Sequence, residues 1–382
     1  MQRITIEISR DEEKKLIENL RKEDTINAQR ILKNYDMPDL SRTKWNPVEM
    51  VTEAFKNIDI FKDFDIIETP EIVGVYETFD LFNFKPDHPA RSKSDTYYVT
   101  DDKILRTHTT VMWYYYFNYP EIKEKLENDG EIWVLSHGKV YRKDEIDRSH
   151  FPIFHQIDWL YICNKEKQII GKEDLIKVLV IMAKSLYGEN VEYKVLDDTF
   201  PYTDPSIQIE IKFWDQRLEI LWSWVVHPTV LDNLWVDSNK YNWWAFGPWI
   251  ERLAMIKKWI PDIRILWSQD PRITKQWWNL DTKYEDVSKY PETYRDISFI
   301  LDKSISLNAL FEIIRDEAWD LVEEVTQLDK YDNAEKFGNN NISYTFRIIY
   351  RSHERTLLND EINDIQLRIR EKTANMLNAQ LR

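Results

Sequence analysis

The chain has 382 residues, 43% of them hydrophobic, and a formal net charge of −15 at pH 7. This length predicts about two or three domains with a core of ordinary size, and the negative charge excludes broad electrostatic adhesion to nucleic acid, so any RNA contact must use a local basic patch. The acidic start and the lack of an apolar run of about 18 residues predict a soluble, cytoplasmic protein with no membrane contact.

The first segment predicts a strand followed by one long helix. Residues 4–8 alternate in polarity, as in a short strand, and Ser9 with Glu12 is typical of a capping box that opens a charged helix reaching about Asn34. Two prolines then indicate a linker over residues 37–47.

The middle of the chain, residues 48–275, mixes strand and helix patterns without regular alternation, which favours an α+β fold. Residues 207–213 alternate as a strand. Residues 175–186 carry an apolar helical face that ends near Gly188. The polar, irregular stretch over residues 275–291 indicates a domain boundary.

After this boundary the pattern predicts a small antiparallel sheet backed by two helices. The order is strand, helix, strand, strand, helix, over residues 296–301, 307–317, 321–328, 343–350 and 360–377.

Three stretches carry residue types suited to a nucleotide. Arg142 and Phe154 flank a polar turn, where a guanidinium can clamp a phosphate and a ring can stack on a purine. Arg252 falls in the first turn of a helix after Gly247, a place suited to a polyphosphate. Glu219 lies on an apolar strand and could hold Mg²⁺. Taken alone, Arg142 and Arg252 are better interpreted as ordinary surface arginines, and a buried glutamate such as Glu219 is also often structural.

Taken together and in this order, the three stretches resemble the motifs of class II aminoacyl-tRNA synthetases, in detail the α-type catalytic domain of phenylalanyl-tRNA synthetases. Further matching runs are residues 88–91, 105–110, 154–156, 200–206, 226–228, 247–255 and 262–264. The C-terminal part resembles the ferredoxin-fold anticodon-binding domain, in residues 294–299 and 351–357.

The resemblance implies three regions. A strand–helix extension and linker over residues 1–47 precede an α+β catalytic domain over residues 48–280, an antiparallel sheet flanked by helices. A ferredoxin-like anticodon-binding domain follows over residues 290–382. These regions leave no room for a large editing domain, so tyrosine must be rejected when the amino acid is activated.

The family joins phenylalanine to ATP as an adenylate, releases pyrophosphate and passes the aminoacyl group to tRNA(Phe), with Mg²⁺ as cofactor. The resemblance implies that a single chain, favoured as a monomer, does this. Implied nucleotide contacts are Arg142 (α-phosphate), Arg252 (γ-phosphate), Phe154 (adenine), Asp144 and Glu219 (Mg²⁺). Implied phenylalanine contacts are His108, Thr110, Gln156, Asp158, Phe200, Tyr202 and Ala245. The implied tRNA patch is Arg347, Arg351 and Arg355, although these could instead form an ordinary solvated edge.

Some positions depart from the family pattern. Asp158 and Thr110 stand where the family has Glu and Ser, which conserves the chemistry. Trp113 replaces Gln and removes a polar contact, while Tyr202 replaces Phe and adds a hydroxyl to the ring pocket. Side-chain specificity is therefore less defined than the family. A ligase for another amino acid and a catalytically impaired tRNA-binding paralogue remain alternatives.

Glycine is scarce and tryptophan abundant: the chain has 7 Gly, about 1.8% against about 7% in ordinary chains, and 16 Trp. The tryptophans that fall where the resemblance implies glycine are Trp159, Trp222, Trp224, Trp235, Trp243, Trp249 and Trp259, with Trp319 a further case. Trp244 and Trp267 fall where the family accepts aromatics. One hypothesis is a bacterial gene that reads UGA as glycine, translated here as tryptophan. The alternative is a decayed synthetase.

Overall fold

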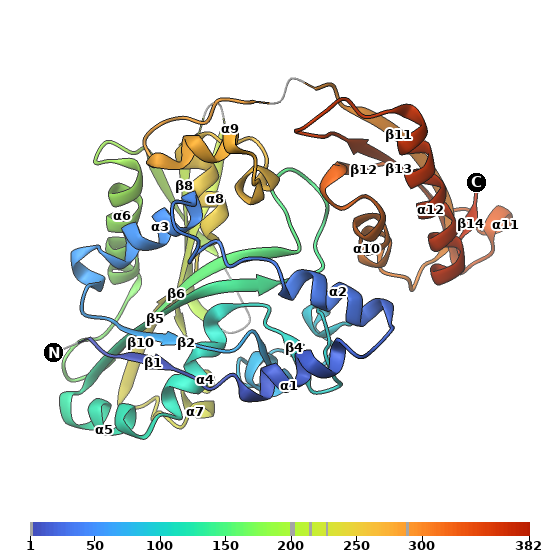
Figure 1. Ribbon diagram of the computed structural model, residues 1–382. Helices are drawn as coiled ribbons and strands as arrows, with labels where there is room; N and C mark the ends of the chain where they lie inside the picture. The colour runs from blue at the N-terminus through green and yellow to red at the C-terminus, as the bar shows by residue number, and fades with distance from the viewer. Residues whose placement is uncertain (1–2, 199–202, 214–215, 227, 288–289) are drawn as a thin grey trace. The chain divides into compact units, whose positions relative to one another are not determined.

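The computed structural model describes residues 3–198, 203–213, 216–226, 228–287 and 290–382 (Figure 1). They form two compact units. The first comprises Met1–Tyr141, Ile153–Ile260 and Gln276–Lys283, and the second comprises Arg142–Pro152, Pro261–Lys275 and Tyr284–Arg382. No helix in these described ranges is both long and apolar enough to cross a membrane.

An eight-stranded sheet organises the first unit, in the order β1-β2-β5-β6-β10-β9-β8-β7. β1 and β5 both run parallel to β2, and the remaining pairs are antiparallel. The strands are β1 Thr5–Glu7, β2 Asp65–Glu68, β5 Glu131–Tyr141, β6 Ile153–Asn164, β7 Tyr193–Asp198, β8 Thr203–Phe213, β9 Gln216–Val226 and β10 Tyr241–Phe246. A separate antiparallel pair joins β3 Ile72–Gly74 to β4 Lys103–Leu105. The predicted α+β class with an antiparallel sheet is confirmed.

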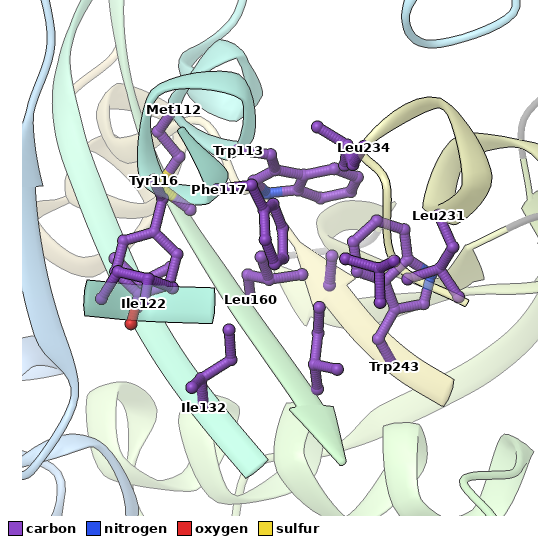
Figure 2. Packing of buried hydrophobic residues seen from close by; sticks show 14 of the residues in the cluster. Met112, Trp113, Tyr116, Phe117, Ile122, Ile132, Leu160, Leu231, Leu234 and Trp243 are labelled. Atoms are coloured by element: carbon purple, nitrogen blue, oxygen red, sulfur yellow. The ribbon is translucent and has the colours of Figure 1, made fainter. Parts of the chain in front are cut away.

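Helices cover both faces of this sheet. On one face α4 (Met112–Phe117), α5 (Pro120–Asp129) and α7 (Pro228–Asn233) bury an apolar cluster. Figure 2 shows Trp113 of α4 and Trp243 of β10 within this cluster. The other face carries α3 (Pro47–Lys56), α6 (Lys172–Tyr187) and α8 (Ile250–Lys258). The predicted helix end at Gly188 is confirmed, and this glycine has φ +94°.

The single N-terminal helix predicted from Ser9 to Asn34 is wrong. The segment forms α1 (Asp11–Leu20) and α2 (Ile26–Tyr35). The side chain of Thr25 accepts a hydrogen bond from the N–H of Ala28 at 3.1 Å, so a second helix begins there. The capping box does not form, because α1 begins after Arg10 without a side-chain cap. The predicted strand over residues 4–8 is confirmed as β1.

The second unit is built on a four-stranded antiparallel sheet in the order β12-β13-β11-β14. Its elements are β11 Thr293–Asp302, α10 Leu307–Ala318, β12 Val322–Tyr331, α11 Ala334–Phe337, β13 Asn341–Tyr350, α12 Asn359–Leu377 and β14 Gln380–Leu381. The predicted order of strands and helices is confirmed, and α11 and β14 are additions.

The remaining short helices are distributed over both units. They are Asp59–Phe61, Tyr76–Asp80, Pro89–Arg91, Thr109–Val111, Ile263–Trp267, Pro271–Thr274 (α9), Lys275–Trp278 and Trp319–Leu321.

The core of the second unit includes a residue from far upstream. Ile146, in the segment Arg142–Pro152, is 6% exposed and belongs to the same apolar cluster as Phe311 and Phe346. Its carbonyl accepts a hydrogen bond from the N–H of Val325 at 2.9 Å. This segment is therefore packed with the C-terminal sheet, although it follows β5 in the chain.

Candidate active site

Strand β6 presents three of the predicted site residues at every second position. Phe154, Gln156 and Asp158 are spaced two residues apart, so their side chains lie on one face of the strand. Opposite them on β5 are Val140 and Gly138, the register partners of Phe154 and Gln156. The hairpin is paired over its full length, which fixes the spacing of these side chains.

Asp158 is the centre of a buried polar cluster. Its carboxylate accepts a hydrogen bond from the hydroxyl of Thr110 at 3.2 Å and another from the hydroxyl of Thr109. The N–H of Thr109 donates to Oε1 of Gln156 at 3.2 Å. Three predicted phenylalanine contacts, at positions 110, 156 and 158, are thus brought together. Thr109 is a member of this cluster that the sequence did not single out.

Gly247 approaches this cluster so closely that no side chain fits. A Cβ built there would lie 2.5 Å from Oδ1, 2.7 Å from Cγ and 2.8 Å from Oδ2 of Asp158. Because Asp158 is fully buried and hydrogen-bonded, its carboxylate has little room to move. The position therefore requires glycine for contact rather than for φ.

Four further phenylalanine contacts were predicted, at His108, Ala245, Phe200 and Tyr202. The Nε2–H of His108 donates to the carbonyl of Thr78 at 3.1 Å, and the His108 ring lies edge-on to Phe82 at 5.3 Å. Ala245 is fully buried and belongs to the same apolar cluster as Trp113 and Trp243. Phe200 and Tyr202 lie outside the described residues.

On the nucleotide side, an indole lies between two predicted contacts. The ring of Trp249 is 4.6 Å from the ring of Phe154 and 4.8 Å from the guanidinium of Arg252, measured from ring centroids. Arg252 is in the first turn of α8, and Trp249 directly precedes that helix. Position 249 also pairs with Gln156 through an isolated antiparallel bridge. Phe154 and Arg252 therefore flank one place, and the indole occupies it.

A buried ion pair that sequence reasoning missed joins these elements. Nδ1 of His155 lies 2.6 Å from Oε1 of Glu251, and the N–H of His155 donates to Oε2 at 2.8 Å. Nε2 lies 3.3 Å from Oδ1 of Asp39. Burial lowers the pKa of His155, but Glu251 and Asp39 outweigh burial and raise it to about 9. The N–H of Leu40 points at Nε2 from 2.9 Å and favours the neutral ring, but two carboxylates outweigh one amide dipole. The pair fixes β6 against α8, one residue from both Phe154 and Arg252.

Arg142 and Asp144 lie in the segment Arg142–Pro152, which belongs to the second unit. The N–H of Arg142 donates to the carbonyl of Pro152 at 3.1 Å, which closes the base of their loop. The guanidinium of Arg315 contacts the carbonyls of Asp144 and Glu145, at 3.0 Å for the latter. The loop is thus held by its own unit.

Glu219 lies on β9 opposite another carboxylate. Its register partner on β8 is Glu210. Residues directly opposite on antiparallel strands share a face, and like charges there repel. No group of three or more His, Cys, Asp or Glu side chains within the described ranges could hold a metal. One or two carboxylates completed by substrate phosphates is nevertheless a usual arrangement for Mg²⁺, so these residues fit the ion.

The three arginines predicted to contact tRNA are each paired within the second unit. Arg347 is 2.8 Å from the carboxylate of Asp296 and stacks 4.1 Å above the ring of Tyr294. Arg351 pairs with Glu323 and Glu292, at 2.6 and 2.7 Å, and Arg355 pairs with Glu361. These cations are locally neutralised, so RNA would have to exchange with carboxylates to bind them.

Two family models match the chain. The model described as tRNA synthetases class II core domain (F) matches residues 33–277, and the model of the ferredoxin-fold anticodon binding domain matches residues 288–382.

Named relatives align over most of the chain. The phenylalanine–tRNA ligase, chloroplastic/mitochondrial, of Arabidopsis thaliana is 37% identical over 321 residues, covering 81% of this chain and 71% of the relative. The mitochondrial phenylalanine–tRNA ligase of Dictyostelium discoideum is 33% identical over 378 residues, covering 84% and 80%. That of Mus musculus is 30% identical over 387 residues, covering 89% and 82%.

The predicted cytoplasmic location is wrong on this comparison, because all three of these relatives carry mitochondrial or chloroplastic names. An acidic first segment argues only against a targeting peptide in that segment. It carries no information about the compartment in which the folded protein works.

Proposed function

This chain belongs to the phenylalanine–tRNA ligase family of class II tRNA synthetases, and from that membership we propose that it activates L-phenylalanine with ATP and transfers it to tRNA(Phe). The carboxylate of phenylalanine attacks the α-phosphorus of ATP, and the bond to pyrophosphate breaks. A hydroxyl of the terminal tRNA ribose then attacks the carbonyl carbon, and AMP leaves. Catalysis consists mainly of positioning and electrostatic stabilisation.

The buried carboxylate of Asp158 carries the amino-acid half of the proposal. With Gln156 beside it, it offers acceptors for the α-ammonium of phenylalanine, and Thr109 and Thr110 hold it in one orientation. A buried carboxylate gains most from a paired cation. His108 lies near the polar end of the substrate and Ala245 in the ring pocket, to which the family resemblance also assigns Phe200 and Tyr202.

The nucleotide half rests on Phe154 and Arg252, which flank one place at the start of α8. Adenine stacks on Phe154, and Arg252 binds the γ-phosphate near the positive end of the helix. Arg142 binds the α-phosphate, where charge develops during adenylation, and Asp144 contacts the nucleotide. Glu219, together with the phosphates, would hold Mg²⁺, which when bound would neutralise part of the polyphosphate charge.

The C-terminal unit provides the tRNA-binding half. Arg347, Arg351 and Arg355 contact tRNA(Phe) after exchanging their carboxylate partners for phosphates. Such exchange makes binding depend strongly on salt. The chain acts alone as a monomer, and light scattering on the purified protein at working concentration tests this.

A catalytically impaired paralogue is the second candidate function, and the Trp249 indole beside Phe154 is the observation that favours it. ATP–pyrophosphate exchange separates the two. Exchange stimulated by phenylalanine supports the ligase, exchange with another amino acid refutes the assigned substrate, and no exchange with any amino acid even after Trp243→Gly and Trp249→Gly, together with retained tRNA binding, favours the paralogue.

A further inference from the structure

Tryptophan occupies backbone conformations that are nearly closed to it. Among the residues that the structure describes, six other than glycine have a positive φ, and four of these are tryptophans. They are Trp45 (71°), Trp235 (60°), Trp259 (61°) and Trp319 (37°); the other two are asparagines. Asparagine is the expected exception in this region, whereas a bulky side chain there is an outlier. The sequence resemblance independently assigns glycine to three of the four positions.

Helix α7 ends in a hydrogen-bond pattern that normally carries glycine. The N–H of Val236 donates to the carbonyl of Leu231 at 3.0 Å. The N–H of Trp235 donates to the carbonyl of Asp232 at 3.0 Å. These two bonds define a Schellman motif, and Trp235 holds its left-handed position, where glycine is the usual residue.

Helix α8 ends in the same way. The N–H of Ile260 donates to the carbonyl of Met255 at 2.9 Å, and the N–H of Trp259 donates to Ile256 at 3.3 Å. Trp259 has φ 61° and ψ 37°. By contrast, helix α5 ends at Gly130, with nearly the same dihedrals, φ 70° and ψ 7°. One structural role is thus filled by glycine at one helix and by tryptophan at two others.

Trp319, which ends helix α10, has an even less favourable backbone conformation. Its φ of 37° and ψ of −103° lie outside the left-handed helical region as well as the two ordinary regions. Only glycine adopts such a combination without a clash of Cβ with the backbone.

Tryptophan also fills the places proposed for the substrates. Trp249 lies against Phe154 and Arg252, where the nucleotide should lie. Trp243 is fully buried 4.8 Å from Trp113 and two residues before Ala245 on the same face of β10, where the ring pocket should lie (Figure 2). An indole thus lies in each of the two proposed subsites.

We propose that positions 45, 235, 259 and 319, together with 243 and 249, are glycine in the protein that the cell makes, because its gene carries UGA at these positions and the cell reads UGA as glycine. Translation with UGA as tryptophan then produces the sequence described here. A decayed gene would scatter tryptophan without regard to φ. The glycine identity of positions 45, 235, 259 and 319 rests on their backbone conformation, whereas that of positions 243 and 249 rests also on the proposed function.

The codons and the natural protein provide the first test. We expect UGA at positions 45, 235, 259 and 319 and UGG at Trp244 and Trp278, and peptide mass spectrometry of the protein from its own cell should find glycine at the UGA positions. UGG codons at the four positions, or tryptophan in the peptides, overturns the proposal. Neither readout depends on folding or activity.

Paired substitutions in the recombinant chain provide the second test. Trp235 and Trp278 are 60% and 66% exposed, but only Trp235 has a positive φ. Trp235→Gly should raise the midpoint of thermal unfolding by a few degrees, since it relieves backbone strain. Trp278→Gly should not raise it. Equal effects of the two substitutions would contradict the argument from φ.

A third measurement addresses the nucleotide subsite. Trp249→Gly should tighten ATP binding by at least about tenfold, because a closed site lowers the apparent affinity by the fraction of molecules that are open. Trp244→Gly, on the same unit, is the matched control and should leave ATP binding unchanged. If glycine is found at position 249 and ATP binding does not improve, the residue identity stands and the subsite assignment fails.

Discussion

Gly247→Ala tests whether Asp158 binds the ammonium of phenylalanine. The new methyl group would lie 2.5 Å from Oδ1 and 2.7 Å from Cγ of Asp158, well inside van der Waals contact, so the whole side chain of Asp158 must shift away from it. This shift disrupts the hydrogen bonds from Thr109 and Thr110 and misplaces the acceptor proposed for the substrate. The substitution therefore removes the ammonium contact without changing any charge.

The expected loss follows from the strength of that contact. A hydrogen bond to a charged group is worth about 1.5–3 kcal/mol, and each 1.4 kcal/mol is about tenfold in affinity. Measured in a chain with glycine at positions 243 and 249, the KM for phenylalanine in ATP–pyrophosphate exchange should rise by about 10- to 100-fold. The KM for ATP should change little, because the three atoms nearest to a Cβ built at position 247 all belong to Asp158.

Gly171→Ala is the matched control. Gly171 has φ −131°, and no atom lies within 4 Å of a Cβ built there. It should leave both KM values unchanged. Circular dichroism and urea unfolding establish that both variants fold. A folded Gly247→Ala protein with an unchanged KM for phenylalanine would refute the role of Asp158, and equal increases for both substrates would show a general distortion instead.

Three further outcomes are expected. Arg142→Ala and Arg252→Ala should each abolish most phenylalanine-dependent exchange while the circular dichroism spectrum is retained, because each removes a phosphate contact worth at least about 1.5–3 kcal/mol; near-normal exchange would contradict the phosphate roles. The chain should not hydrolyse tyrosyl-tRNA, and some mischarging with tyrosine is expected, because an apolar pocket rejects a hydroxyl by only about 10²-fold. Ala245→Gly should admit larger para-substituted rings, as measured by ATP–pyrophosphate exchange with such analogues. The pKa of His155 is raised to about 9, so the contribution of its ion pair to stability is present in full below the unfolded-state pKa of about 6.5 and is lost as pH rises through about 9. The urea midpoint of unfolding should therefore decline between pH 6 and 9, and Glu251→Gln should flatten this decline. An unchanged slope would contradict the ion pair.

Local patterns in the sequence were sufficient to predict most elements. The alternation over residues 207–213 appears as β8, and the apolar face that ends at Gly188 appears as α6. The C-terminal order of strands and helices could be predicted because each element carries its own period. The break between α1 and α2 was missed, since Thr25 is compatible with a helix interior until its side chain caps the next helix.

Contacts between distant residues were not predictable from the same patterns. His155 and Glu251 are 96 positions apart, and neither has a neighbour that marks it as one half of a buried pair. Resemblance to a family selected Gln156, Asp158 and Thr110, which the structure brings together. It offered no means of detecting Thr109, whose role depends on the carboxylate that it contacts. The roles of the site residues remain predictions.

The place of Ile146 in the second core has a consequence for folding during synthesis. Its hydrogen-bond partner Val325 is made much later, and at about 5–20 residues per second the ribosome needs on the order of ten seconds or more to reach it. Until then Ile146 lacks the apolar cluster in which it is buried. A nascent chain can therefore complete its first sheet before this part of the loop reaches its native packing, which forms only as the C-terminal strands emerge.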